Sequence, residues 1–511
     1  NVPVTEIGPR KPRTLVLCFD GTSNEFHNQN TNVVKLHSIL RKDTPESQLC
    51  YYQARNSLMF HFSARLRTAQ AGIGTYFQPG VVSPIFRFGA RALDEALAWY
   101  LSEHIMDGYK FLMQNYHEGD SVCIFGFSRG AYTARALAGM LHKVGLLSKD
   151  NLEQVHFAYK LYKSSNHETH KLAVRFKRAF SREVPIEFLG VWDTVSSVGI
   201  FSRRTLPFVG TNKTIRIFRQ ALSLDERRAK FCPNLYHRPV TAPVTQPPQA
   251  EPLMKRMART LNIYKRSKRN PDTPHDPLHP NIYALHGKKA GFETDIKEVW
   301  FVGAHCDVGG GLAKDTEEHA LSNISLRWMV NEIVKAQCDI HFDESALGLW
   351  NMIPITAIKR IPIPMTREAS DSTLRDEESE LGLGQDMPDK YHASVAREAN
   401  TSTSAPRHNS AGAPFPFQSV EDPLDAMDVA QKIGNALRKN VFWWILELVP
   451  TYHEWQDEDD EWVGKWKFHL GRGREVPPHP LFHKSVKTCI ENPLLKYSPR
   501  AQYKKGTEKY V

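Results

Sequence analysis

Short runs rich in apolar residues recur along the chain, separated by turns or by longer amphipathic stretches. Each run contains five to seven residues, and the runs are Thr14–Phe19, Gln48–Gln53, Ser121–Phe125, Ile186–Trp192 and Ile296–Val302. Runs of this length are typical of strands that are buried on both faces of a parallel sheet. We therefore predict five strands at these positions.

Two stretches between these runs have helical periodicity instead. Residues 86–116 place seven apolar side chains on one helical face, and these are Leu93, Leu97, Tyr100, Leu101, Ile105, Tyr109 and Leu112. Residues 131–145 are good helix formers and end at Gly145. Strands that alternate with helices predict an α/β fold, with a mostly parallel central sheet and helices on both of its faces.

Composition divides the chain into a main domain, two unusual segments and a tail. Residues 239–290 are rich in proline and basic residues, and residues 366–426 are rich in Ser, Asp, Glu, Ala and Pro. We interpret the first as an insert in a main domain spanning 12–350, and the second as a flexible segment. Aromatic residues return in the tail. We expect residues 427–500 to form a helical and aromatic C-terminal extension that packs on the main domain.

A glycine-rich turn after the third strand carries a serine. Gly126-Phe127-Ser128-Arg129-Gly130 matches the GxSxG pattern, in which the serine occupies a sharp, strained turn from a strand to a helix. Larger side chains two positions before and after the serine would collide with neighbouring backbone. The preceding run is apolar and the following stretch is helical, which is the context that the pattern requires. We predict that Ser128 is the nucleophile of an α/β-hydrolase; an ordinary glycine-rich turn is the alternative.

A serine nucleophile needs a histidine base and an acid that orients it. In this fold the chain order is serine, acid, histidine, and the last two follow strands. Asp193 follows Ile186–Trp192, and His305 follows Ile296–Val302 within a few residues. His483 is the alternative base, because the tail can fold near the site. Asp307 is the alternative acid, two residues after His305.

Backbone donors are also required, because the tetrahedral intermediate carries a negative charge. The helix that starts after Ser128 brings its N-terminal partial charge and the N–H of Arg129. A second donor usually comes from a loop after an early strand, and Asp20, Gly21 and Thr22 form such a loop. We expect Asp20 to cap or order this loop, with cation binding as the alternative. The chemistry requires neither a metal nor an organic cofactor.

The net charge and the cysteines indicate which binding partners and which cellular compartment to expect. The 511 residues carry a formal net charge of +10, which favours anionic partners or reflects basic loops alone. No nucleic-acid fold signature accompanies the basic run Lys265–Arg269, so a nucleic-acid partner is not expected. Seven scattered cysteines without metal-type spacing favour a reducing, cytoplasmic compartment. No stretch reaches the roughly 18 apolar residues that span a bilayer.

Residues 251–269 predict a basic amphipathic helix. Leu253, Met257, Leu261 and Tyr264 fall on one face, and six basic residues crowd much of the remainder: Lys255, Arg256, Arg259, Lys265, Arg266 and Arg269. Such a helix suits peripheral contact with an anionic lipid surface. The alternative is a helix packed on the domain with a solvated basic face.

Seven motifs carry a family resemblance. They occur in the order TLVLCFDGTSN, AGIGTY, FGFSRGAYTARALAGML, FLGVWDTVSSVG, ALSLDERRAKF, WFVGAHCDVGGG and LSNISLRWMV. Together they resemble the DUF2235 family of α/β hydrolases, which is similar to the Tle1-type phospholipase effectors of bacterial type VI secretion and has many fungal members. The resemblance covers roughly residues 12–330 and part of the tail from about 430.

The resemblance implies a triad in the GFSRGA, VWDTVSS and GAHCDVGGG motifs, that is, on Ser128, Asp193 and His305. It further implies hydrolysis of carboxylic esters through an acyl-enzyme, with a lipase or phospholipase type of activity and a lipid substrate. Residues 239–290 and 366–426 depart from the family pattern. Two alternatives remain open, which are a soluble esterase or thioesterase for small acyl groups and a catalytically silent interaction protein.

Overall fold

The computed structural model describes residues 11–22, 28–55, 101–164, 166–195, 206–236, 293–348, 423–439, 442–448, 451–456 and 462–511. The predicted insert 239–290 and the predicted basic helix 251–269 lie outside these residues, as does most of the predicted flexible segment 366–426. The following description is limited to the described residues.

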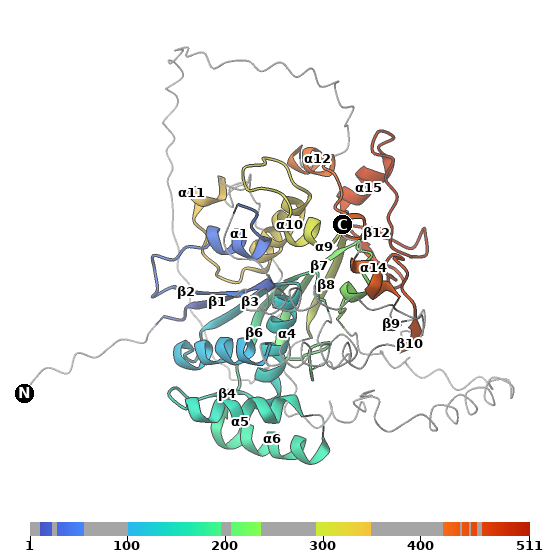
Figure 1. Cartoon of the computed structure of the whole chain (residues 1–511). Helices are drawn as coiled ribbons and strands as arrows, with labels where there is room; N and C mark the ends of the chain where they lie inside the picture. The colour runs from blue at the N-terminus through green and yellow to red at the C-terminus, as the bar shows by residue number, and fades with distance from the viewer. Residues whose placement is uncertain are drawn as a thin grey trace, which may run out of the picture. The chain divides into compact units, whose positions relative to one another are not determined.

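Eight strands form the central sheet, in the order β2-β1-β3-β6-β7-β8-β11-β12 (Figure 1). Each neighbouring pair is parallel. The strands are β1 Thr14–Thr22, β2 Gln48–Arg55, β3 Ser121–Phe127, β6 Ile186–Trp192, β7 Ile215–Ser223, β8 Asp295–Phe301, β11 Leu481–Phe482 and β12 Lys509–Tyr510. The five strands predicted from apolar runs are confirmed as β1, β2, β3, β6 and β8, and the sheet is that of an α/β-hydrolase-like fold.

Strand β7 is the central strand that the apolar pattern missed. Its sequence IRIFRQALS contains three polar side chains in its first six residues, so it does not stand out as an apolar run. The buried Arg219 is accommodated because its guanidinium pairs with Glu332 at 2.7 Å and with Asp295 at 2.6 Å. Paired charges of this kind can be buried.

Helices cover both faces of the sheet (Figure 1). The described helices are α1 Asn32–Ile39, α4 Arg129–Val144, α5 Leu152–Lys163, α6 His167–Phe180, α9 His305–Gly309, α10 Leu321–Ala336, α11 Glu344–Leu347, α12 Pro423–Val429, α13 Ala436–Lys439, α14 Phe442–Glu447 and α15 Lys484–Glu491, together with the 3₁₀ helix η1 Ala229–Phe231. Residues 101–115 are also helical. Both predicted helices are therefore confirmed within the described residues. None of these helices is long and apolar enough to cross a bilayer.

Strand β1 shows how the core forms on both faces. Leu15, Leu17 and Phe19 pack in the cluster that contains α4, α5 and residues 105–116. Val16 and Cys18 point the other way, into the cluster with α1 and α10. Side chains alternate along a strand, so a strand that is apolar at every position fits between two layers of helices.

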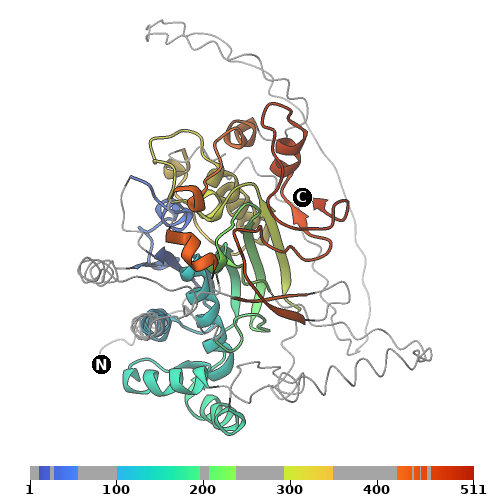
Figure 2. The ribbon, with the colours of Figure 1, turned by 45° about the vertical axis from the view of Figure 1, so that its right-hand side comes forward.

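Two strands from the chain after residue 422 extend the central sheet (Figure 2). Strand β11 pairs with β8, and β12 then pairs with β11. Two short pairs lie outside the central sheet, β4 Leu146–Leu147 with β5 Ser181–Arg182 and β9 Thr451–Gln456 with β10 Trp462–Lys467.

The first four residues of helix α12 fall inside the predicted flexible segment 366–426. Residues 423–426 belong to this helix, because Arg327 of α10 binds the carboxylates of Asp425 and Asp428. Composition alone could not reveal these partners, which lie about a hundred positions away in the sequence.

Candidate active site

Ser128 lies in the turn between β3 and α4, with φ 57° and ψ −121°. Non-glycine residues rarely adopt a positive φ, and a strained backbone of this kind is common at functional sites. A Cβ on Gly126 would lie 2.6 Å from the carbonyl oxygen of Gly130. The Ser128 N–H donates to the Trp192 carbonyl at 3.0 Å, which ties the turn to the end of β6. The predicted steric reason for both glycines is present in the structure.

The end of β1 lies against the start of α4. The prediction of a loop at Asp20, Gly21 and Thr22 is wrong, because these residues continue strand β1 to Thr22. A Cβ on Gly130 would come within 2.2 Å of the Phe19 carbonyl oxygen and 2.4 Å of the Asp20 carbonyl oxygen. Strands β2 and β3 flank β1 on opposite sides, and ligands of α/β sheets bind at the carboxyl ends of such strands. The end of β1, which contains Asp20, therefore lies beside the serine turn that follows β3.

Asp20 is buried near the end of β1. Its Oδ1 accepts hydrogen bonds from the Gly21 N–H at 2.6 Å and the Thr31 hydroxyl at 2.8 Å, and its Oδ2 accepts from the Tyr52 hydroxyl at 2.9 Å. These contacts hold the end of β1 in place, so Asp20 orders a strand end here and not the predicted loop. Thr22 ends β1 opposite Arg55, and Arg129 is the first residue of α4.

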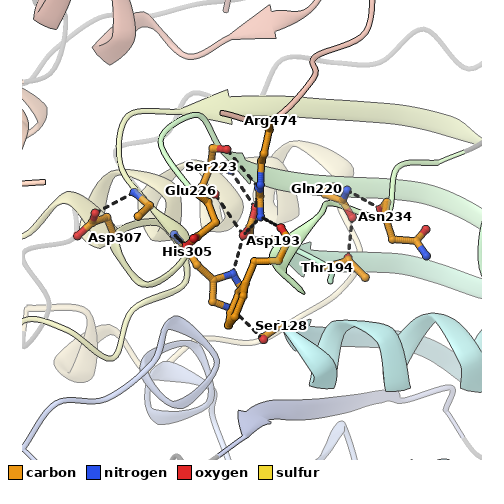
Figure 3. A network of polar contacts seen from close by, with 12 residues as sticks. Ser128, Asp193, Thr194, Gln220, Ser223, Glu226, Asn234, His305, Asp307 and Arg474 are labelled. Atoms are coloured by element: carbon orange, nitrogen blue, oxygen red, sulfur yellow. Dashed lines mark hydrogen bonds and ion pairs between the residues drawn. The ribbon is translucent and has the colours of Figure 1, made fainter. Parts of the chain in front are cut away.

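His305 begins α9, directly above Ser128 (Figure 3). Its Nε2 lies 2.8 Å from Ser128 Oγ, and its Nδ1 lies 2.5 Å from Asp193 Oδ2. The ring packs against Phe127 at 4.6 Å and Phe231 at 4.8 Å between centroids. Burial lowers the pKa of His305, against the opposing effect of the hydrogen bond from its ring to Asp193. The neutral ring is the form that can accept a proton from a serine.

Asp193 follows β6 and is fully buried. Its backbone φ is 42°, and its N–H donates to the Ala221 carbonyl at 2.7 Å. The Ser223 N–H and hydroxyl donate to its carboxylate at 2.9 and 3.2 Å. Burial alone would raise the pKa of Asp193, but the charge of Arg474 and the bond to His305 hold it well below the ordinary value.

Arg474 is a site residue that the sequence reasoning missed. Its Nη1 lies 2.6 Å from Asp193 Oδ1, and its Nη2 lies 2.9 Å from Asp193 Oδ2. Figure 3 shows its guanidinium on the side of Asp193 away from Ser128. The residue stands in a GRGRE stretch of the tail, and nothing in that local pattern distinguishes it from an exposed arginine.

Glu226 and Arg228 flank the histidine on its backbone side. Glu226 Oε2 accepts from the His305 N–H at 3.3 Å and binds Arg228 Nη2 at 2.7 Å. Burial would raise the pKa of Glu226, yet the bonds and charge of Arg228 lower it to about 2. Arg228 also covers the Phe231 ring at 3.4 Å. This ion pair was likewise not anticipated, although both residues stand in the ALSLDERRAKF motif.

The structure does not bring the two alternative residues to the serine. The His483 ring accepts from the Ser485 N–H at 3.3 Å as the N-cap of α15, and it stacks on Phe301. Asp307 accepts from the backbone N–H groups of Ala304 and Gly434, each at 2.8 Å. Burial raises the pKa of Asp307 to about 6. The carboxylate hydrogen-bonded to the His305 ring is that of Asp193.

The arrangement places a serine hydroxyl, a buried imidazole and a buried carboxylate in one hydrogen-bonded line. That is the geometry required for acyl transfer. Within the described ranges, no group of three or more His, Cys, Asp or Glu side chains is positioned to hold a metal ion. All seven cysteines are free thiols.

Comparisons with known proteins cover most of the chain. A family model described as "T6SS, Phospholipase effector Tle1-like, catalytic domain" matches residues 13–332. The chain is also similar to "Uncharacterized protein YEL023C" of Saccharomyces cerevisiae, with 30% identity over 570 residues that cover 93% of this chain and 78% of the yeast protein.

Two solved structures are similar at lower identity. An uncharacterized protein from Pseudomonas aeruginosa is 17% identical, with a TM-score of 0.32 over 69% of this chain and 49% of that chain. The Tle1 effector, solved bound to the VgrG spike of the type VI secretion system, is 14% identical, with a TM-score of 0.27 over 60% of this chain and 53% of that chain. The chain thus spans about half the length of these two solved proteins.

Proposed function

Since this chain belongs to the family of Tle1-like phospholipase effector catalytic domains, we propose that it is a serine hydrolase that cleaves carboxylic esters of lipids through an acyl-enzyme. The observation that carries the proposal is the hydrogen-bonded line from Ser128 Oγ through the His305 ring to Asp193, with distances of 2.8 and 2.5 Å. The strained backbone at Ser128 supports the same assignment, because it presents the hydroxyl at the head of a helix.

Acylation begins when Ser128 Oγ attacks the ester carbonyl carbon and His305 Nε2 takes the hydroxyl proton. Asp193 holds the proton on Nδ1, so that Nε2 is the basic nitrogen, and it stabilises the imidazolium that forms. The oxyanion accepts hydrogen bonds from the Arg129 N–H and from one backbone N–H at the Gly21–Thr22 end of β1. The tetrahedral intermediate then collapses, and His305 returns the proton to the departing alcohol.

Deacylation repeats these steps with water. His305 removes a proton from the water as its oxygen attacks the acyl carbon, and Ser128 leaves with that proton. The products are a free acid and the regenerated enzyme. Every proton in the cycle moves through His305 Nε2, and Asp193 remains ionised throughout because its pKa lies well below the ordinary value.

The first test uses purified full-length protein with and without Ser128→Ala, assayed on phospholipid vesicles and on a soluble short-chain ester. We expect the substitution to reduce turnover by more than about a thousandfold, as losses of a triad member usually do. Labelling by a fluorophosphonate probe should disappear as well. Ser345→Ala is the matched control, because Ser345 is an exposed serine whose hydroxyl binds Asp343.

Two results would contradict the proposal. A folded Ser128→Ala protein that kept more than about a tenth of the wild-type turnover would exclude Ser128 as the nucleophile. A wild-type protein that neither labels nor hydrolyses any ester would support a silent interaction protein. An ester chain-length series, assayed below and above the micelle point, separates a lipase-type enzyme from a small-acyl esterase or thioesterase.

A further inference from the structure

We propose that Arg474 is a positioning residue of this active site, and that the C-terminal extension completes the catalytic machinery by clamping the carboxylate of Asp193. The inference rests on the proposed hydrolase function. It adds a component that lies beyond residues 13–332, where the catalytic-domain family model matches.

The guanidinium of Arg474 is held at a fixed place. Besides its two bonds to Asp193, Nη1 donates to the Ser223 carbonyl at 3.2 Å and Nη2 donates to the Phe231 carbonyl at 2.5 Å. The side chain is 2% exposed, and that of Asp193 is fully buried. The two end nitrogens of the guanidinium therefore join the Asp193 turn, the end of β7 and η1.

The backbone around Arg474 is equally constrained. The Arg474 carbonyl accepts from the Gln502 N–H at 2.7 Å, and a Cβ on Gly473 would lie 1.6 Å from the Arg500 carbonyl oxygen. The chain then continues into β11, which pairs with β8, the strand that precedes His305. The same tail segment thus adds to the sheet and supplies the guanidinium.

The two parallel hydrogen bonds from Arg474 constrain the Asp193 carboxylate more than a single ammonium group could. They fix the rotation of the Asp193 carboxylate, because both oxygens are engaged, and so aim Oδ2 at His305 Nδ1. A buried carboxylate without a partner would be costly and would favour protonation. Arginine stays protonated at every working pH, so Asp193 remains ionised whether the imidazole is neutral or charged.

The clamp also sets the basicity of the imidazole. A carboxylate beside a histidine raises its pKa, and a cation on the far side of that carboxylate opposes the effect. Among the described residues, the other charged groups that act on His305 are Glu226, which binds the His305 N–H, and Arg228, which neutralises Glu226. Removal of the Arg474 charge should therefore leave His305 more basic and move the acid limb of activity to higher pH.

The test compares Arg474→Met and Arg474→Lys in the full-length chain. The pH dependence of kcat/KM is measured on a soluble short-chain ester. For Arg474→Met we expect the acid midpoint to rise by about one pH unit and kcat to fall by about 10-fold to 100-fold. Arg474→Lys should keep the midpoint near the wild-type value, because the charge remains. It should still lose about 10-fold in kcat, because one ammonium cannot hold both oxygens.

Arg327→Met is the matched control. Arg327 is another buried arginine, and it binds Asp425 and Asp428 of α12 rather than the triad. Its loss should lower the melting temperature without moving the pH midpoint. If Arg327→Met moved the midpoint as far as Arg474→Met, or if Arg474→Met left it unchanged, the clamp would have no role beyond stability.

A second readout does not depend on ester hydrolysis. The Nδ1 proton of a histidine bonded to a carboxylate gives a low-field proton NMR signal. The titration of this signal reports the pKa of His305 in wild type and in the variants. The signal is assigned to His305 by its absence from the spectrum of His305→Gln. A wild type without esterase activity would refute the proposed function, while the NMR midpoints would still decide the role of Arg474. If Arg474→Met does not fold, a folded Arg474→Lys with wild-type kcat overturns the proposal.

Discussion

A Cβ atom on Gly309 would lie 1.8 Å from Cε2 of Phe127. The short helix α9, which begins at His305 and ends at Gly309, therefore packs directly on the ring of the residue before Ser128. The same ring lies 4.6 Å from the His305 ring. The Phe127–Gly309 contact thus lies directly beside the side chains proposed as base and nucleophile.

Gly309→Ala should impair catalysis without removing any catalytic group. The added methyl group must displace the Phe127 ring or α9, and such overpacking costs about 1–3 kcal/mol. A displacement of His305 by about 1 Å can lower the rate by about 100-fold. Assays of kcat and of the melting temperature check both effects.

Gly348→Ala is the control for this substitution. Among the described residues, no atom lies within 4 Å of a Cβ built on Gly348, and Gly348 has helical backbone angles at the end of α11. We expect unchanged activity and equal or slightly higher stability. A Gly309→Ala enzyme with wild-type kcat would show that the close contact does not govern the base.

His305→Ala should lower kcat, whereas His483→Ala should lower the stability of the fold. The first removes the ring that contacts Ser128 and should lower kcat by more than about a thousandfold. The second removes an N-cap and a stacking partner of Phe301, so it should lower stability by about 1–2 kcal/mol and leave kcat nearly unchanged. A near-normal His305→Ala beside an inactive His483→Ala would reverse the assignment of the base.

His483 should make the fold sensitive to acid. Burial, together with the charges of Lys484 and Arg327, lowers its pKa from an ordinary value near 6.5 to about 3. The unfolded chain therefore binds a proton at this position below about pH 6.5, and the folded protein does not until about pH 3. Stability from this residue is complete above pH 6.5 and is lost as the pH falls between these values.

The substitution His483→Asn isolates this effect. Asparagine keeps an N-cap acceptor for α15 and does not titrate. Between pH 8 and pH 5, the melting temperature of wild type should fall by at least about 2 °C more than that of the variant. We expect this difference even if the variant has the lower melting temperature at pH 8. Equal drops in the two proteins would mean that other groups cause the acid sensitivity.

The basic segment 251–269 lies outside the described residues, so its role stays a prediction. If it docks on membranes, changing Lys255, Arg256, Arg259 and Lys265 to glutamate should weaken sedimentation with anionic vesicles, since each basic residue near the surface contributes about 1 kcal/mol. Hydrolysis of vesicle lipid should slow, while hydrolysis of a short soluble ester should not. Equal effects on both substrates, or none, would exclude the docking role.

The sequence alone determined the parts of this protein that depend on local pattern. The apolar runs of β1, β3 and β6 and the glycines around Ser128 are encoded within a few residues of one another, because strand burial and a strained turn constrain immediate neighbours. Asp193 and His305 could be proposed as partners because the ends of parallel strands meet at one edge of a sheet.

Tertiary structure decided what depends on residues far apart in the chain. Strand β7 is buried although it carries Arg219, because Glu332 and Asp295 neutralise that charge from other elements. The choice of Asp193 over Asp307 at the His305 ring, and the place of His483 at α15, follow from packing rather than from any motif. Arg474 reaches Asp193 across 281 positions of sequence. Its role is invisible in the sequence because an arginine in a polar stretch acquires a buried partner only when β11 joins the sheet.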